Sequence, residues 1–189
     1  MKSKKFASGV FMLILVLMLS AWTSSSKQNN SDNTIITDQN KIKISQMHSG
    51  SGEVPKGLKE AKNPAYKVGS QVIVNADHMK GMYGAKAVIK GAYDTTAYVV
   101  TYKPTTGGPL VTHHKWVIQE EIKNAGTTIL KPGTEVTLEA NHMKGMMGAK
   151  GTINSAVYTT VYMIDYIPTT GGPIVKNHKW VIESELSAE

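Results

Sequence analysis

The feature that most constrains this chain is an internal repeat that recurs at one constant offset without a gap. The repeat starts near Tyr66, and its clearest match joins His78-Met-Lys-Gly-Met-Tyr-Gly-Ala-Lys86 to His142-Met-Lys-Gly-Met-Met-Gly-Ala-Lys150. Two later motifs recur at the same offset, Pro104-Thr-Thr-Gly-Gly-Pro109 as Pro168-Thr-Thr-Gly-Gly-Pro173 and His114-Lys-Trp-Val-Ile118 as His178-Lys-Trp-Val-Ile182. Self-similarity of this kind indicates one structural unit that is used twice.

The repeat divides the chain into four predicted regions. Residues 64–124 and 125–189 are the two repeats, and the short segment Lys123–Leu130 joins them. Residues 23–63 are rich in Ser, Asn, Gln, Lys and Gly, which predicts a flexible, disordered linker because little can be buried there. Residues 1–22 hold lysines followed by an apolar run, the pattern of a secretory signal peptide or a membrane anchor.

The N-terminal segment predicts export and leaves the mode of attachment open. Its apolar run extends from Val10 to Leu19, and Leu19-Ser20-Ala21 is similar to the first positions of a bacterial lipobox. Trp22 stands where the lipobox cysteine would follow, so a lipid cannot be attached at that position. The stretch Phe6–Trp22 is slightly shorter than the roughly 20 residues of a spanning helix. Cleavage and retention as an anchor therefore both remain open, and we expect the rest of the chain at the outer cell surface.

Each repeat is predicted to be all-β. In the first repeat, short runs rich in β-branched and aromatic residues are separated by glycine-rich turns, which is typical of strands. Five short strands in about sixty residues favour a small barrel, and the pattern resembles SH3-like (KOW-like) barrels. The expected fold is thus two tandem barrels, one per repeat. The expected strands are Gln71–Asn75, Ala85–Lys90, Ala97–Tyr102, Leu110–Thr112 and Lys115–Ile118, and Gln119–Ile122 is at most one helical turn.

Composition narrows the function. The 189 residues carry a formal charge of +7 and contain no cysteine, which excludes thiolate metal sites and disulfides. All the basic residues are lysines, so the guanidinium groups that read phosphate and guanine are missing and nucleic acid is not an expected partner. An enzyme is not expected either, since Asp77 becomes Asn141 in the second repeat and no Ser/His/Asp set recurs.

The repeated histidine-methionine loops predict a soft metal site in each repeat. Imidazole nitrogen and thioether sulfur suit copper, with Cu(I) favoured, whereas zinc rarely uses a thioether. In an SH3-like barrel the end of the first strand lies beside the start of the last, so His78 is expected near His114 although the two are far apart in the sequence. The same argument joins His142 to His178. The predicted ligands are His78, Met79, Met82 and His114 in the first repeat and His142, Met143, Met146 and His178 in the second.

Other interpretations of these residues remain open. Methionines in small barrels are often core residues, and the motif can also recur because Gly81 and Gly84 shape a turn. Trp116 and Trp180 are expected in the core, with a role in ligand stacking as the alternative. His113 has no counterpart in the second repeat and is treated as peripheral.

The long repeated motifs also resemble those of a known family. The segment Gly52-Glu-Val-Pro-Lys-Gly-Leu-Lys59 and both repeats, about residues 53–186, are similar to the YdhK family of bacterial exported proteins. That resemblance implies a duplicated domain long described as of unknown function, on a Gram-positive cell surface. Some members look like CopL-type surface lipoproteins, which accompany copper exporters and bind copper outside the cell. The resemblance supplies no ligand set.

Together these features predict an extracytoplasmic copper-sequestering protein that contributes to copper tolerance. Membrane or cell-wall association is expected from the N-terminal segment. The alternative is a cell-surface module without metal that recognises a wall polymer or a peptide through the barrel face near Trp116 and Trp180. The sequence leaves open the metal's oxidation state and stoichiometry, the oligomeric state, and whether the sites lie within or between repeats.

Overall fold

The structure is a computed structural model that describes residues 50–189. The predictions for residues 1–22, and for most of the linker 23–63, lie outside the described residues. Within the described part, no helix is long and apolar enough to cross a membrane.

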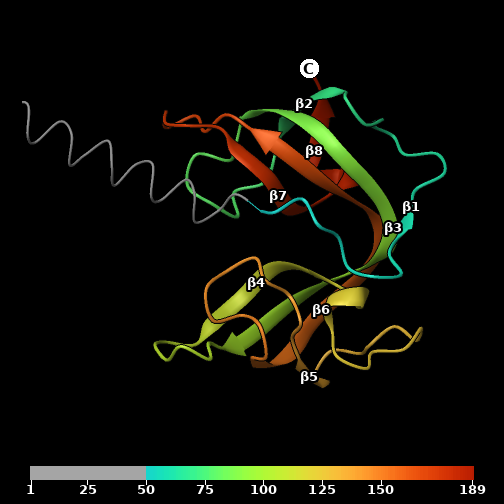
Figure 1. Cartoon of the computed structure of the whole chain (residues 1–189), viewed down its shortest axis with the longest axis vertical. Coiled ribbons are helices and arrows are strands. Elements are labelled where there is room, and N and C mark those ends of the chain that lie inside the picture. Colours follow the sequence, from blue (N-terminus) through green and yellow to red (C-terminus); the bar gives the residue numbers. More distant parts are fainter. Residues whose placement is uncertain (1–49) are drawn as a thin grey trace, which may run out of the picture.

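The described residues form an almost entirely β structure, which confirms the predicted fold class. Figure 1 shows two small, barrel-like units, an upper and a lower one, with two long strands running through both. Eight strands belong to one hydrogen-bonded sheet. The elements are β1 (Lys59–Glu60), β2 (Gln71–Val74), β3 (Lys86–Lys103), β4 (Val111–Ile118), the 3-10 turn η1 (Gln119–Glu121), β5 (Glu135–Thr137), β6 (Lys150–Tyr166), β7 (Val175–Ile182), the 3-10 turn η2 (Glu183–Glu185) and β8 (Leu186–Ala188).

The two long strands differ from the short strands expected from the sequence. The segments Ala85–Lys90 and Ala97–Tyr102 are not separate strands but the two ends of β3, which is 18 residues long. β3 pairs antiparallel with β6 along nearly its whole length, from Ala87 opposite Tyr166 to Lys103 opposite Lys150. No glycine-rich turn interrupts the middle of β3. The strand therefore continues from the upper unit into the lower one instead of folding back.

As a result, each barrel-like unit combines halves of both repeats. The upper unit contains β2 and the first part of β3 from repeat one, with the last part of β6, β7 and β8 from repeat two. The lower unit contains β5 and the first part of β6 from repeat two, with the last part of β3 and β4 from repeat one. One barrel per repeat, as expected at 64–124 and 125–189, is therefore not the arrangement in space, because β3 and β6 exchange units.

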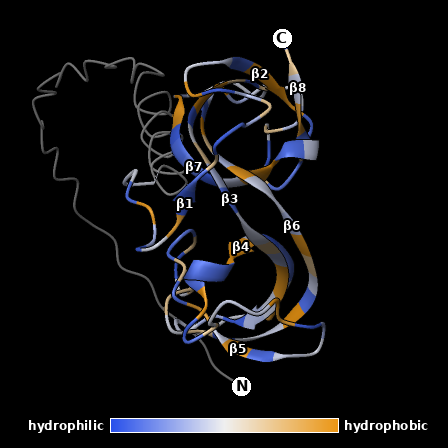
Figure 2. Cartoon of the chain, turned by 90° about the vertical axis from the view of Figure 1, so that its right-hand side faces the viewer, coloured by the Kyte–Doolittle hydropathy of each residue, from blue (hydrophilic) through white to orange (hydrophobic). Residues whose placement is uncertain are grey.

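The hydrophobic cores follow this exchange. The upper core packs Val72, Val74 and Ile89 from repeat one against Tyr162 and Val181 from repeat two. The lower core is built the same way from the complementary halves, with Tyr98, Tyr102, Val117, Leu138, Met146 and Ile153 among its members. Neither half-repeat thus buries its apolar face without the other repeat. Figure 2 shows the units one above the other, with β3 and β6 passing between them.

A third cluster lies where the two units meet. Trp116 and Trp180 are its largest members, and they pack with Tyr93, Ile118 and Met163. Because successive strand residues point to opposite faces, Ala97 and Val99 of β3 join this cluster while Tyr98 and Val100 join the lower core. The junction between the units is therefore a packed core and not a flexible hinge.

The described end of the predicted linker, residues 50–63, is docked on the sheet. Lys59 and Glu60 form β1 and pair with β3, and the Gly50 amide donates to the Lys176 carbonyl at 2.8 Å. Leu58 packs against the junction cluster. This part of the chain differs from the expected flexible tether, because backbone pairing and one apolar side chain hold it in place.

Candidate metal-binding site

The histidine-methionine loops are built by glycines that pack against the opposite repeat. Gly81 and Gly145 have φ of +81°, a conformation that favours glycine. A Cβ on Gly81 would lie 2.6 Å from Thr170 Oγ1, and one on Gly145 would lie 2.5 Å from Thr106 Oγ1. The amide of Thr169 donates to the Gly81 carbonyl at 2.9 Å. The Pro-Thr-Thr-Gly-Gly-Pro turns therefore hold these loops in position.

All four predicted histidines line one pocket at the junction of the units. With two of the predicted methionines they surround a space of about 130 Å³. The structure thus merges the two expected sites, one per repeat, into a single place. The pocket is lined by His78, Met79, His114, His142, Met143 and His178, together with Gly50, Lys115, Asn141, Asn177 and Lys179.

The exchange of strands changes which histidines are neighbours. His114 and His142 belong to different repeats but to the same lower unit, and their ring centroids are 6.3 Å apart. His78 instead packs edge-on to Trp116 at 6.4 Å. The expected rule, that the first loop of a barrel lies beside the start of its last strand, holds for His114 and His142. These two histidines come from different repeats because β3 crosses between the units.

Met82 and Met146 do not reach the pocket. Both are 0% exposed and belong to the upper and lower cores. The prediction that Met82 and Met146 are ligands is therefore wrong, because their loops turn these two side chains into the hydrophobic cores. Met79 and Met143, three positions earlier, are only partly buried and line the pocket, so one methionine of each loop is a core residue and the other is a candidate donor.

Two carboxylates bind the pocket histidines from behind. Glu185 Oε1 lies 2.8 Å from His78 Nε2, and Glu121 Oε1 lies 2.6 Å from His142 Nε2. The second oxygens accept hydrogen bonds from indoles, Glu185 from Trp116 Nε1 at 2.8 Å and Glu121 from Trp180 Nε1 at 3.1 Å. Each glutamate therefore connects a histidine and a tryptophan of the other repeat.

Sequence reasoning missed these two glutamates, although a signal was present. Glu121 and Glu185 are separated by the same offset as the histidines, whereas the preceding residues, Glu120 and Ser184, differ. Both occur in the 3-10 turns η1 and η2. Burial would raise the pKa of Glu185, but hydrogen bonds from His78, Trp116 and the Ile182 backbone outweigh it and hold the pKa below its usual value.

The ring nitrogens supply the chemistry of the pocket. The Nδ1 atoms of His78 and His142 and the Nε2 atom of His114 are buried without a hydrogen-bond partner among the described residues. Burial lowers the pKa of His114 to about 4, and the nearby His142 and His78 contribute to this lowering, while Glu121 opposes them. His114 is consequently neutral near pH 7 and keeps a lone pair for a ligand.

The histidines of the pocket are not grouped as a metal-binding cluster in this structure. Among residues 50–189, no three His, Cys, Asp or Glu side chains are grouped so that they could hold a metal. Methionine sulfur adds donors that only a soft ion prefers. The residues present therefore fit a soft metal better than calcium, magnesium or zinc.

Comparison with known proteins decides the family. A family model described as "Protein of unknown function (DUF1541)" matches residues 68–119 and 132–183, once in each repeat. The chain belongs to the DUF1541 family. It is 59% identical to the "Uncharacterized protein YdhK" of Bacillus subtilis (strain 168), over 191 residues that cover 100% of this chain and 92% of YdhK.

Solved structures of YdhK resemble this DUF1541 chain closely. The crystal structure of YdhK from Bacillus subtilis at 2.00 Å resolution has a TM-score of 0.74 and 68% identity, covering 76% of this chain and 97% of that one. The solution NMR structure of the YdhK C-terminal domain has a TM-score of 0.62 and 68% identity, covering 65% of this chain and 93% of that one. These likenesses confirm the resemblance to the YdhK family.

The tryptophans of this DUF1541 chain are core residues, as expected from the sequence. Trp116 is 7% exposed and Trp180 is 0% exposed. Their indole N–H groups bond to the two glutamates. His113 is exposed and lies outside the pocket, and it has φ of +51°, as Asn177 has φ of +50°. His113 and Asn177 occupy equivalent positions within β4 and β7, at irregularities of strand register, where such a backbone favours residues like asparagine.

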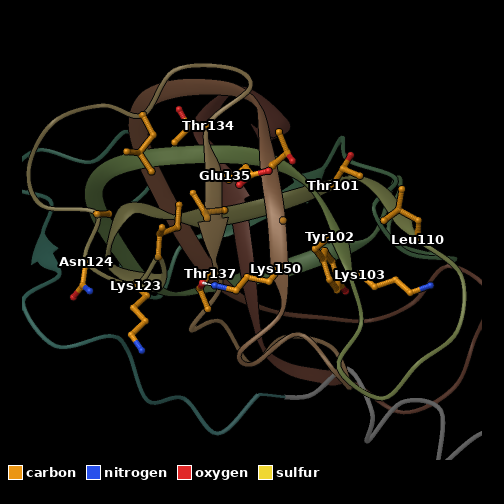
Figure 3. A pocket seen from close by; sticks show the side chains of 16 residues that line it. Thr101, Tyr102, Lys103, Leu110, Lys123, Asn124, Thr134, Glu135, Thr137 and Lys150 are labelled. Atoms are coloured by element: carbon orange, nitrogen blue, oxygen red, sulfur yellow. Dashed lines mark hydrogen bonds between the residues drawn. The ribbon is translucent and has the colours of Figure 1, made fainter.

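A larger, open groove lies on the lower unit, away from the histidines. It has a volume of about 1010 Å³, and Figure 3 shows Lys103, Lys123 and Lys150 at its wall. Lys150 Nζ donates to Thr137 Oγ1 at 2.7 Å, and Lys103 Nζ donates to the Gly108 carbonyl at 2.7 Å. The described residues that line the groove include no histidine or methionine. Its volume exceeds that of the junction pocket, but the repeated histidines line the pocket and not the groove.

Proposed function

We propose that this protein binds copper, preferably as Cu(I), in the junction pocket and sequesters it outside the cell membrane. The observation that supports the proposal is the convergence of imidazoles and thioethers from both repeats on one pocket. Separate stretches of chain bring these donors together, and several ring nitrogens there lack a hydrogen-bond partner among the described residues. Buried polar atoms without partners are uncommon and costly, and a bound soft ion would satisfy them.

The charges around the pocket favour a monovalent ion. Methionine carries no charge, and His114, whose pKa burial lowers to about 4, is neutral near pH 7. The two nearby carboxylates already accept hydrogen bonds from histidine and tryptophan. Lys115 and Lys179 also line the pocket, and Lys115 Nζ lies 3.8 Å from Glu185 Oε1. A divalent cation would face these ammonium groups with no free carboxylate among the described lining residues to offset its charge, so Cu(I) is the better match.

A single pocket lined by donors of both repeats supports one shared site per chain in place of two. The rings of His114 and His142 have centroids 6.3 Å apart. Two imidazoles bound to one metal bring their nitrogens within about 4 Å of each other, because metal–nitrogen bonds are about 2.0 Å. Copper bound by both rings would therefore draw the His142 loop slightly towards β4. This movement would involve Met143, which lies next to His142 in the loop.

The physiological role that follows is copper tolerance. Residues 1–22 have the pattern of an export segment, so the pocket would meet copper at the outer cell surface. Holding the ion there, in association with the membrane or wall, lowers the amount that reaches the membrane. No catalytic step is required for this role, and we propose a binding protein and not an enzyme.

The test is an anaerobic titration of the purified protein with Cu(I) in competition with a chromogenic chelator, repeated with Cu(II) and Zn(II). We expect one tight Cu(I) equivalent per chain and weaker binding of the other ions. The double variant His78→Ala/His142→Ala should lose more than the 10–100-fold that loss of an outer partner of a metal ligand typically causes. The control is Lys123→Ala in the groove, which should bind Cu(I) like the wild type.

Two outcomes would reject the proposal. One is Cu(I) affinity that the histidine substitutions leave unchanged. The other is two independent and equal Cu(I) sites, which would mean that each repeat binds on its own. In cells, deletion of the protein should lower growth at raised copper, and the double histidine variant should fail to restore it.

A further inference from the structure

The two glutamates behind the pocket have equivalent surroundings. Glu185 contacts His78 Nε2 at 2.8 Å with one oxygen, and with the other it accepts from Trp116 Nε1 at 2.8 Å and the Ile182 amide at 3.2 Å. Its side chain is 12% exposed and that of His78 is 7% exposed. Each of these polar neighbours of the carboxylate is thus a hydrogen-bond donor.

Glu121 repeats this arrangement in the other half of the molecule. It contacts His142 Nε2 at 2.6 Å, and it accepts from Trp180 Nε1 at 3.1 Å and the Ile118 amide at 3.2 Å. The side chains of Glu121 and His142 are 5% and 8% exposed. The two halves of the molecule therefore contain the same triad of tryptophan, glutamate and histidine.

An ionised carboxylate accepts hydrogen bonds and cannot donate them. The nitrogen that faces it must therefore carry the proton, which makes Nε2–H the donor in His78 and His142. In a neutral imidazole the other nitrogen then holds the lone pair. That nitrogen, Nδ1, is buried and without a hydrogen-bond partner among the described residues in both rings.

We infer that Glu121 and Glu185 are positioning residues that hold His142 and His78 in the Nε2–H tautomer, so that Nδ1 is the atom offered to a soft cation in the pocket. This inference rests on the proposed function, since it assigns the donor atoms of that site. Hydrogen bonding of the outer nitrogen to a carboxylate is a common way of orienting metal-binding histidines. Each glutamate and its histidine come from different repeats, so the exchange of β3 and β6 must form before the pairs can meet.

The first test needs no metal. Long-range ¹H–¹⁵N correlation spectra of the ¹⁵N-labelled, metal-free protein at neutral pH report which ring nitrogen carries the proton. We expect His78 and His142 as Nε2–H tautomers. In Glu185→Gln the His78 ring should shift to a tautomer mixture, because an amide can accept or donate, while His142 stays unchanged. Glu121→Gln should give the reverse pattern, so each variant contains its own control.

The second test uses Cu(I), which is diamagnetic and leaves the spectra readable. In the wild type, Cu(I) should move the ¹⁵N resonances of Nδ1 in His78 and His142 far more than those of Nε2. Each Gln variant should bind Cu(I) 10–100-fold more weakly. Glu120→Gln is the matched control, because Glu120 is adjacent in the chain and contacts Thr95 at 2.7 Å instead of a pocket histidine. It should bind Cu(I) like the wild type.

The results separate this inference from the proposed function. Nδ1–H tautomers or fully protonated rings in the metal-free wild type would overturn the inference whatever the metal result. Tight Cu(I) binding that Glu121→Gln and Glu185→Gln leave unchanged would also overturn it, while copper binding itself would stand. If the wild type shows the expected tautomers but binds no Cu(I), the copper function fails and with it the donor role of Nδ1. Unfolding of a variant is recognised in the same spectra, and Glu121→Asp and Glu185→Asp then provide a shorter carboxylate that should restore the Nε2–H tautomer.

Discussion

The junction pocket and the groove on the lower unit differ in how they relate to the repeat. Most of the pocket's side chains occur in pairs at the repeat offset, such as His78 with His142 and Lys115 with Lys179. The groove, by contrast, includes Asn124 and Leu130 from the segment that joins the repeats. The pocket is therefore lined mainly by equivalent residues of both repeats, whereas the groove also uses the segment between them.

The comparison also applies within the histidine-methionine loops. Tyr83 and Met147 are the positions at which the two copies differ, and both are exposed, at 67% and 51%. Met82 and Met146 are identical and are completely buried. Met79 and Met143 are identical too, but they line the pocket. Identity between repeats therefore does not by itself separate a core position from a pocket position, whereas burial does.

Separating the repeats is the most drastic way to break both regions. A fragment of residues 125–189 keeps β5, β6 and β7 but loses the half of each core that repeat one supplies. We expect no cooperatively folded monomer, because most of its buried apolar surface would face water. The fragment should be unfolded in NMR spectra or should dimerise by the same exchange of strands, which analytical ultracentrifugation detects. A stable folded monomer would contradict the exchanged architecture.

Substituting the methionines separates core from pocket within one loop. Met146→Ala should destabilise the protein by about 2–5 kcal/mol, the usual cost of truncating a buried methionine, as measured by chemical denaturation. Met79→Leu/Met143→Leu should cost less than about 1.5 kcal/mol, since it nearly conserves volume, but should weaken Cu(I) binding. Met82→Leu/Met146→Leu is the matched control and should leave Cu(I) affinity unchanged. If Met82→Leu/Met146→Leu weakened Cu(I) binding and Met79→Leu/Met143→Leu did not, the assignment of Met79 and Met143 as sulfur donors would be wrong.

A smaller effect is expected when the pH is changed, because the stability of the folded protein depends on the protonation of His114 in the pocket. The groups that face His114 are His142, His78 and Glu121, and burial lowers its pKa from 6.5 to about 4. The unfolded chain therefore binds a proton more readily than the folded one between these values. Stability is fully present above pH 6.5 and is lost as the pH falls towards 4, by at most about 3 kcal/mol at 1.36 kcal/mol per pKa unit.

Denaturation of the metal-free protein at a series of pH values measures this effect. His114→Gln should reduce the slope of stability between pH 6.5 and 4. The neighbouring, exposed His113→Gln is the control and should leave the slope unchanged. An identical slope in wild type and His114→Gln would mean that His114 titrates normally in the folded protein.

The sequence by itself determined the repeat, the β class and the four histidines that meet in one pocket. These properties depend on local patterns, since alternating apolar residues, glycine turns and a constant repeat offset are visible without any long-range contact. The repeated histidines also pointed to a site, and the strand argument correctly placed the first loop of a barrel beside the start of its last strand.

Only the tertiary structure decided which copies of these residues meet. Whether a segment such as Gly91–Thr96 folds back or continues depends on pairing with a distant strand of the other repeat, here β6, and no local signal distinguishes the two outcomes. Continuation of β3 crossed the halves and merged two expected sites into one pocket. It also placed Glu121 and Glu185 behind histidines of the opposite repeat. Contacts over such distances in the sequence are properties of the packed sheet and not of any segment within it.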